Sequence, residues 1–312
     1  MARVGTWVGA GVAFLVAVVL TVAGVGDRAD AFPNWEAFIL GAVQGFTELL
    51  PISSSGHLIL VPWLGGWDYL ETHEEFNKTF DVALHLGTLV AVIVYFRHEL
   101  AALVRAWFGT LWRRRIETDD ERIAWYVVVA TIPAAIVGAA FEDPIDRHLG
   151  DPWQIAILLA VFAVLLWLSD RVAQRRGMED VGWAGAVGIG VAQCLALMPG
   201  VSRSGITITA SRFLGLNRDA AARFSFLLLV PIVFGAALLK GVKDVLLGGL
   251  PPGSAGPFVV GVLTSAATGL LAIWFLLAYV RRHTYSLFVV YRLVVAAVIA
   301  LLILTGVYEA TF

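Results

Sequence analysis

The chain has 312 residues, of which 59% are apolar and 15% are charged, and its mean hydropathy is +0.82. Soluble domains carry roughly 25% charged residues, so this composition predicts an all-α, polytopic membrane protein and argues against nucleic-acid binding. The net charge of −2 indicates little by itself. The single cysteine, Cys194, excludes an intrachain disulfide and a cysteine-based metal cage.

The N-terminal leader, residues 1–31, contains Arg3, an apolar run from Trp7 to Val25 and the sequence GDRADA. It fits either a signal peptide, with a small-residue cleavage site at residues 29–31, or an extra, uncleaved transmembrane helix. The length of the apolar run favours the uncleaved helix. In both cases Arg3 stays in the cytoplasm, and residues 32–312 form a single membrane-embedded domain.

Two interrupted apolar segments and six uninterrupted ones follow. The interrupted segments are Trp35 to about Trp67, which precedes a polar loop at 68–78, and Val181 to Leu216. Since about 20 apolar residues cross a bilayer, full spans are predicted near 80–96, 123–141, 153–168, 224–239, 257–280 and 287–307. Three spans follow each interrupted segment, which gives repeats of about 35–169 and 181–307.

Arginines predict the side on which each loop lies. The loops at 97–122, 171–176 and 281–282 are rich in arginine, whereas 142–151 is net acidic and 246–256 is uncharged. The positive-inside rule places the three arginine-rich loops in the cytoplasm. This is possible only if each interrupted segment enters and leaves by one face. Because three spans separate the two re-entrant hairpins, they enter from opposite faces, as in an inverted-topology repeat.

The two hairpins contain related sequences that align without a gap at an offset of 149, QGFTELLPISSSGHL (Gln44–Leu58) and QCLALMPGVSRSGIT (Gln193–Thr207). Proline and glycine interrupt both, and backbone that leaves the helix inside a bilayer survives only where it lines a cavity. Each break exposes N–H groups at the start of the returning half-helix, where the macrodipole adds positive charge. Two such ends meeting in the membrane favour an anion, phosphate above all.

Several side chains at these breaks are candidates for chemistry. Hydroxyl groups in membrane helices also serve as packing residues, but a charged residue there marks function, which applies to Arg203 and Glu48. His57 lies three positions after Ser54, on the same helical face. By contrast, Asp81 and His85 suggest a local hydrogen bond near a span end. Ser211 and Ser225 are interpreted as packing residues.

Together the two sequences resemble the undecaprenyl-diphosphate phosphatase family, the BacA-type polyprenyl pyrophosphate phosphatases. The family signatures are Glu or Gln, three residues and Glu before P-x-S-S-x-G-H, and then P-G-x-S-R-S-x-x-T. The resemblance extends from about Trp35 to the C-terminus. It implies six spans, two re-entrant hairpins, a homodimer, and a site toward the outer face of a prokaryotic plasma membrane.

The resemblance also implies an activity. Family members remove the terminal phosphate of undecaprenyl diphosphate and so regenerate the lipid carrier for peptidoglycan and other cell-wall glycans, and loss of this activity is linked to bacitracin sensitivity. The resemblance assigns four roles: Glu48 as the acid, Ser54 as the catalytic serine, His57 as the catalytic histidine and Arg203 as the phosphate-binding arginine. Substrate-binding positions are Ser53, Ser55, Gly56, Ser202, Ser204, Gly205 and Thr207.

A divalent cation, Mg²⁺ or Ca²⁺, is implied as well, held through Glu48. Gln44 occupies the first acidic position of the signature, and an amide is a weaker metal ligand than a carboxylate, so its part in metal binding is doubtful.

Two mechanisms and further functions stay open at this point. Ser54 is the candidate nucleophile with His57 as proton acceptor, or His57 and Glu48 position an attacking water. A transporter or flippase for an anionic lipid could use the same architecture. An intramembrane serine protease is disfavoured because no G-x-S-x-G motif is present. The Ser-x-x-His pair beside an arginine favours the phosphatase.

Overall fold

The structure is a computed structural model that describes residues 32–173, 175–240 and 254–311. The predicted leader and most of the uncharged loop at 246–256 lie outside the described residues. The regular elements of the described part are helices: α2 (Asn34–Leu49), α3 (Ser54–Gly65), α4 (Asp68–Thr72), α5 (Glu74–Arg113), α6 (Asp119–His148), α7 (Pro152–Ser169), η1 (Met178–Asp180), α8 (Gly182–Cys194), η2 (Leu195–Leu197), α9 (Arg203–Phe213), α10 (Arg218–Lys240), α11 (Ala255–Val280) and α12 (Ser286–Leu304).

Six of these helices, α5, α6, α7, α10, α11 and α12, are long and apolar enough to cross a membrane. They confirm the six predicted spans and the all-α, polytopic fold class. The helices of the interrupted segments, α2, α3, α8 and α9, have 16, 12, 13 and 11 residues. At 1.5 Å per residue each measures about 16 to 24 Å, less than the roughly 30 Å of a hydrocarbon core.

Much of the sequence predicted as loop is helical. The polar segment after the first hairpin contains α4 and the start of α5, and α5 continues to Arg113 through the arginine-rich segment, with a kink at Phe96 (φ −97°, ψ 16°). Likewise, α6 continues to His148 through most of the predicted acidic loop. Hydropathy reports the length of chain in hydrocarbon, and a helix can continue beyond it because charged residues such as Arg and Glu are good helix formers.

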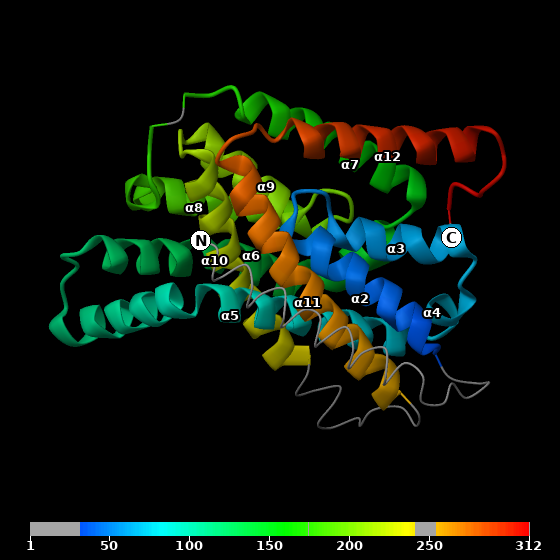
Figure 1. Ribbon diagram of the computed structural model, residues 1–312, viewed down its shortest axis with the longest axis horizontal. Helices are drawn as coiled ribbons and strands as arrows, with labels where there is room; N and C mark the ends of the chain where they lie inside the picture. Colours follow the sequence, from blue (N-terminus) through cyan, green and yellow to red (C-terminus); the bar gives the residue numbers. More distant parts are fainter. Residues whose placement is uncertain (1–31, 174, 241–253, 312) are drawn as a thin grey trace. The chain divides into compact units, whose positions relative to one another are not determined.

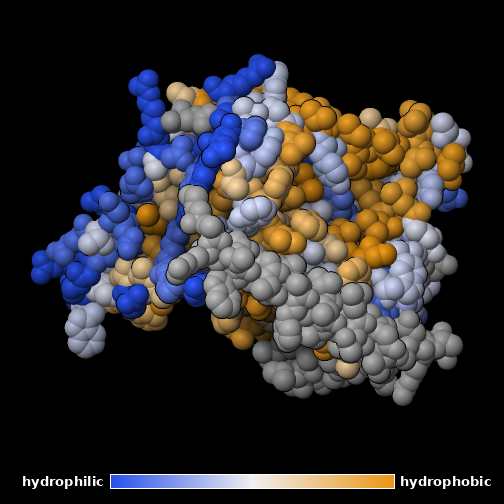
Figure 2. Space-filling model, in the orientation of Figure 1, coloured by the Kyte–Doolittle hydropathy of each residue, from blue (hydrophilic) through white to orange (hydrophobic). Residues whose placement is uncertain are grey.

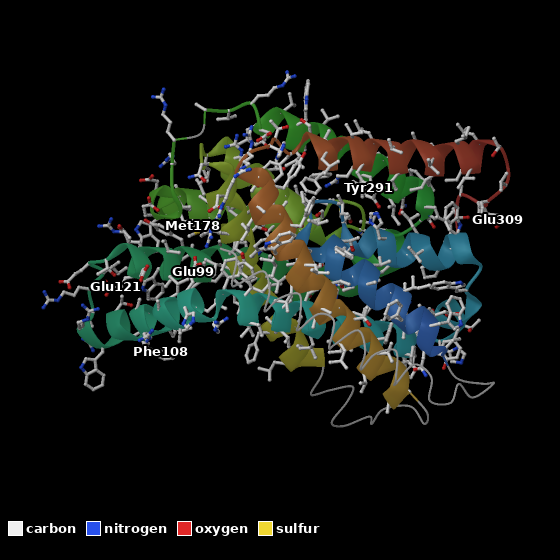
Figure 3. All side chains as sticks on the ribbon, viewed as in Figure 1. Glu99, Phe108, Glu121, Met178, Tyr291 and Glu309 are labelled. Atoms are coloured by element: carbon white, nitrogen blue, oxygen red, sulfur yellow. The ribbon has the colours of Figure 1, made fainter. Side chains whose placement is uncertain are left out.

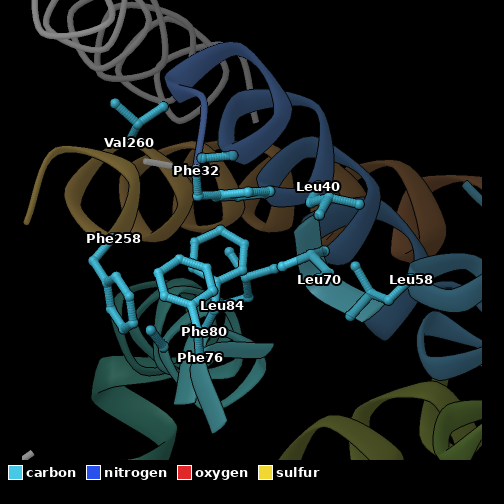
Figure 4. Close-up of a cluster of buried hydrophobic side chains, with 11 residues drawn as sticks. Phe32, Leu40, Leu58, Leu70, Phe76, Phe80, Leu84, Phe258 and Val260 are labelled. Atoms are coloured by element: carbon cyan, nitrogen blue, oxygen red, sulfur yellow. The ribbon is translucent and has the colours of Figure 1, made fainter. Parts of the chain in front are cut away.

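The described residues form two compact units that interleave along the chain, each with parts of both predicted repeats. The first unit comprises 32–49, His57–Tyr95 and the described part of Val233–Phe275. Its core contains a cluster of aromatic rings from α5, α11 and Phe32, two residues before α2, with aliphatic side chains around them (Figure 4). Phe80 lies 5.2 Å from Phe32, 5.7 Å from Phe76 and 5.4 Å from Phe258, measured between ring centroids.

The first hairpin closes within this unit. Trp35, at the start of α2, and Trp67, just after α3, contact edge to face with centroids 5.1 Å apart. The chain therefore returns to the level at which it started, as predicted for a re-entrant segment. Along its length α2 packs closely on α11, because a side chain at Gly45 would collide with Thr268 and the backbone of Ser265.

The second unit comprises Leu50–Gly56, Phe96–Ile232 and Leu276–Phe312, apart from residues 174 and 312. In it α7 lies beside α12, α6 beside α8, and α9 against both α7 and α8 (Figure 1). The second hairpin also closes, because Leu214, after α9, packs against Gly185 near the start of α8. Hydrophobic residues cover α7 and α12 in Figure 2, and Val294 and Leu301 are 55% and 61% exposed, as expected for contact with lipid.

Several charged groups of this unit form ion pairs between helices. Arg113 pairs with Glu121 between α5 and α6, and Arg223 of α10 lies 3.1 Å from Glu99 of α5; both acids are labelled in Figure 3. A buried carboxylate, Asp170 after α7, accepts hydrogen bonds from Arg212 and Arg218 and from the backbone N–H of Tyr285. This network fixes the far end of α9, whose first residues belong to the second break.

Candidate active site

The first break lies between Leu49, the last residue of α2, and Ser54, the first of α3. Ser53 adopts a positive φ of 78°. Its buried hydroxyl oxygen accepts a hydrogen bond from the Gly56 N–H at 3.4 Å, which caps the N-terminus of α3. The predicted substrate-binding residue Ser53 thus shapes the turn from which Ser54 and His57 follow.

The second break repeats this arrangement at the equivalent position of the sequence. Ser202 has a φ of 75°, and its hydroxyl oxygen accepts from the Gly205 N–H at 3.0 Å at the start of α9. The Ser202 and Ser204 hydroxyl groups lie 3.2 Å apart. A positive φ costs a non-glycine residue about 1–3 kcal/mol, so both breaks hold the same strained turn with the same serine cap.

The two breaks contact each other directly, as the sequence repeat predicts. The Gly200 N–H donates to the Ser53 hydroxyl oxygen at 3.1 Å, and the Ser204 hydroxyl donates to the Leu50 carbonyl at 2.9 Å. Within the second unit, α3 and α9 therefore start next to each other, from two breaks that are hydrogen-bonded together. The free backbone N–H groups at the start of each helix lie in the same region.

Arg203 occupies the first position of α9, where it is half-buried and donates to the Ser225 carbonyl at 2.8 Å. Thr207, one turn later and fully buried, donates its hydroxyl proton to the Arg203 carbonyl at 2.8 Å, and its hydroxyl oxygen lies 2.8 Å from that of Ser225. Ser225, interpreted from the sequence as a packing residue, is therefore the α10 residue that orients this end of α9. Ser225 is a single polar residue in an apolar stretch, so the sequence did not predict its contacts with Thr207 and Arg203.

Arg292 contacts both breaks, and the sequence did not single it out as a candidate. It lies in α12, its side chain is 0% exposed, and it donates to five carbonyls. The acceptors are Pro51 (3.3 Å), Gly200 (2.8 Å), Val201 (3.1 Å), Leu158 (3.5 Å) and Leu159 (3.1 Å). One guanidinium thus joins both breaks to α7. The rule that identified Arg203, a charge inside an apolar segment, would have identified Arg292 as well.

The remaining candidates lie in the first unit. Glu48, in the last turn of α2, is 5% exposed, and its Oε2 lies 3.5 Å from Nε2 of His85 on α5. The local hydrogen bond expected at His85 is present, since its Nδ1 lies 2.7 Å from the Asp81 carbonyl oxygen. His57 on α3 is buried. No cluster of three or more His, Cys, Asp or Glu side chains suited to a metal occurs among the described residues.

Substitutions at Ser202 should separate its two structural contributions. Ser202→Ala removes the cap and keeps the strained φ, so we expect it to lower the free energy of unfolding by about 1 kcal/mol. Ser202→Gly also removes the hydroxyl but relieves the strain, so it should be less destabilising than alanine. Thermal unfolding of both purified variants measures the difference. Equal losses would show that the backbone at Ser202 is not strained.

Comparison with known proteins adds two findings. Residues 37–298 match the family described as bacitracin resistance protein BacA. The chain is 46% identical over 275 residues to an undecaprenyl-diphosphatase of Desulforudis audaxviator, covering 87% of this chain and 99% of that protein. The undecaprenyl-diphosphatase of Geobacter sulfurreducens is 49% identical over 259 residues, covering 82% and 93%, and that of Thermomicrobium roseum is 46% identical over 278, covering 86% and 98%.

Proposed function

The chain belongs to the BacA family of bacitracin resistance proteins, and from this premise we propose that the two joined helix breaks form the active site of a membrane phosphatase. The protein hydrolyses undecaprenyl diphosphate to the monophosphate and inorganic phosphate, the activity for which its relatives over most of the chain are named. This reaction recycles the lipid carrier. The observation that best supports this site is the pair of hydrogen bonds between the two breaks, which brings Arg203 and two helix N-termini to one region.

The proposed phosphate site stabilises the negative charge that develops on the transferred phosphoryl group. The N-terminal turns of α3 and α9 offer backbone N–H groups and the positive ends of helix dipoles. Arg203 adds a planar guanidinium that suits phosphate oxygens, and Ser225 holds it in place. In phosphoryl transfer such stabilisation of developing charge is the main catalytic contribution. The polyprenyl tail stays in lipid, as the apolar exposed faces of the spans permit.

Ser54 and His57 supply the covalent and proton-transfer chemistry. Ser54 is the first residue of α3, and its hydroxyl oxygen attacks the terminal phosphorus while the bond to the bridging oxygen breaks. His57 takes the hydroxyl proton and later activates the water that releases phosphate. The second route, direct attack by a water that His57 and Glu48 position, uses the same residues without a phosphoseryl intermediate.

Gln44 and Glu48 fit a divalent cation. Glu48 offers a carboxylate, and both polar atoms of Gln44, one turn earlier on α2, are buried without a hydrogen-bond partner in the described part of the chain. Mg²⁺ and similar ions are commonly held by one or two side chains together with the phosphates of a substrate. When bound, the cation would neutralise phosphate charge. Glu48 would orient it, and the Gln44 carbonyl would be a weaker second ligand.

The orientation of the protein in the membrane is proposed from the positions of its arginines. The arginine-rich segments at 97–122, 171–176 and 281–282 place the first hairpin toward the outer face, where the diphosphate released by glycan assembly would arrive. A homodimer is proposed on the family resemblance. Transport of the lipid has no observation in its favour, because a carrier needs no serine and histidine one turn apart.

Phosphate release by the purified full-length protein tests this function. We expect release from undecaprenyl diphosphate but not from the monophosphate, and we expect a chelator to abolish it reversibly, because the cation offsets charge that otherwise opposes phosphoryl transfer. Arg203→Ala should lower kcat/KM by about 10³-fold, as loss of a key charge-stabilising group does. Activity that survives both the chelator and Arg203→Ala would refute the proposed site.

A further inference from the structure

The side chains of Glu48 and His85 lie so close together that a proton or a cation is needed between their facing atoms. Nδ1 of His85 lies 2.7 Å from the Asp81 carbonyl oxygen, and Nε2 lies 3.5 Å from Oε2 of Glu48. A carbonyl oxygen only accepts hydrogen bonds, so Nδ1 carries the proton, and a neutral ring presents the lone pair of Nε2 to the carboxylate. The two atoms repel each other unless a proton or a metal cation lies between them.

The surroundings of His85 are those of a metal-binding histidine. Such histidines donate their second ring N–H to a carbonyl or carboxylate, which fixes the ring and its tautomer. Four histidines of the described chain contact the carbonyl four residues earlier in this way, namely His73, His85, His148 and His283. Within the described ranges, His85 is the one whose ring also contacts a carboxylate, so this contact distinguishes it.

The spacing of the two donor atoms suits a shared cation. Ligands at about 2.0–2.2 Å from one ion, at angles from octahedral to tetrahedral, lie roughly 2.8–3.6 Å apart. The separation of 3.5 Å between Glu48 Oε2 and His85 Nε2 is at the upper end of that range. It is longer than a charge-assisted hydrogen bond between nitrogen and oxygen, about 2.7–2.9 Å.

Gln44 supplies a second observation that points to a ligand. Its side chain is 0% exposed, and neither its oxygen nor its nitrogen has a hydrogen-bond partner in the described part of the chain. A buried amide without a partner costs about 1–3 kcal/mol. Gln44 precedes Glu48 by four residues, on the same face of α2, so its carbonyl oxygen can serve as a third ligand.

We propose that His85 is a ligand of the divalent cation, together with Glu48, and that its imidazole makes the site prefer Mn²⁺ or Co²⁺ to Mg²⁺ and Ca²⁺. Oxygen-only sites suit Mg²⁺ and Ca²⁺, whereas an imidazole nitrogen favours transition metals. Here the amide of Gln44 replaces a carboxylate and weakens an oxygen-only site, and His85 restores a strong donor. The inference rests on the proposed active site, because the cation serves the same reaction.

The test measures Mn²⁺ binding to the full-length protein in detergent, without substrate, by electron paramagnetic resonance. Electron spin-echo modulation from ¹⁴N reports a nitrogen ligand directly. We expect one bound Mn²⁺ with nitrogen modulation in the wild type. His85→Gln should lose the modulation and bind Mn²⁺ about 10- to 100-fold more weakly. Its Mg²⁺ affinity, measured by competition, should change less than about 3-fold, because glutamine offers an oxygen.

His148→Gln is the matched control, since His148 contacts the Pro144 carbonyl in the same way at 2.8 Å. It should keep the nitrogen modulation and the Mn²⁺ affinity. Nitrogen modulation that persists in His85→Gln, or is absent from the wild type, would overturn the inference and leave a proton between Glu48 and His85. Phosphate release is assayed separately, so an inactive wild type that binds Mn²⁺ through His85 would refute the proposed function alone.

Discussion

Alanine in place of Ser54 is expected to lower the rate of phosphate release from undecaprenyl diphosphate by about 10³-fold or more, the scale of loss when a nucleophile is removed. Ser54 is buried and is the first residue of α3, directly after the Ser53 cap. The substitution removes the Ser54 hydroxyl and leaves the Ser53 cap in place. Acid quenching during turnover of substrate labelled in its terminal phosphate should trap the label on Ser54.

Ser55→Ala is the matched control for this experiment. Ser55 is the next residue of α3 and is half-buried, so the variant removes the same group from the same helical turn. We expect it to lower the rate by less than about 10-fold, as a lost hydrogen bond of about 1 kcal/mol would. If Ser54→Ala turned over within about 10-fold of the wild type and no label were trapped, water would be the nucleophile.

Apolar stretches predicted the membrane-spanning part of the fold well. All six predicted spans correspond to helices of span length, because burial of about 20 apolar residues in lipid leaves the backbone no alternative to a helix. The ends of α5 and α6 were predicted wrongly as loops. In water, local propensity and caps determine where a helix ends, and the capping box of Thr118 and Glu121 at the start of α6 was overlooked.

The sequence repeat predicted that the two breaks meet, but not how. Ser53 and Ser202 were expected to bind substrate, and the structure shows both as helix caps with positive φ. A repeat identifies equivalent positions, whereas the conformation of each turn depends on its tertiary contacts. The hydrogen bond from Gly200 to Ser53 joins residues far apart in sequence, and no local pattern encodes it.

His85 shows where reasoning from neighbours in sequence is insufficient. Asp81 and His85 were correctly expected to form a local hydrogen bond, although the acceptor is the backbone carbonyl of Asp81 and not its carboxylate. The contact on which the proposed cation site rests, from His85 to Glu48, joins α5 to α2. It depends on the packing of two helices, which periodicity alone does not determine.

Methionine in place of Arg292 is expected to destabilise the protein by about 3–5 kcal/mol and to reduce phosphate release at least about 100-fold. The apolar side chain fills part of the volume but removes the guanidinium donor from the carbonyls of Pro51, Gly200 and Val201 in the two breaks. A buried carbonyl without a partner costs about 1–3 kcal/mol. Arg292→Lys keeps the charge but has three donors in place of five, so it should recover part of the loss. Thermal unfolding and phosphate release, assayed well below the transition, measure both effects.

Arg282→Met is the control, because Arg282 is exposed just before α12 and its loss should change stability by less than about 0.5 kcal/mol. If Arg292→Met unfolded like the wild type, the five hydrogen bonds would contribute little. The expected loss of activity has a specific cause: the carbonyls of Pro51, Gly200 and Val201 all face one guanidinium. Without it, these hydrogen bonds from α12 to the turns that precede Ser54 and Arg203, the residues proposed to act on the phosphate, are lost.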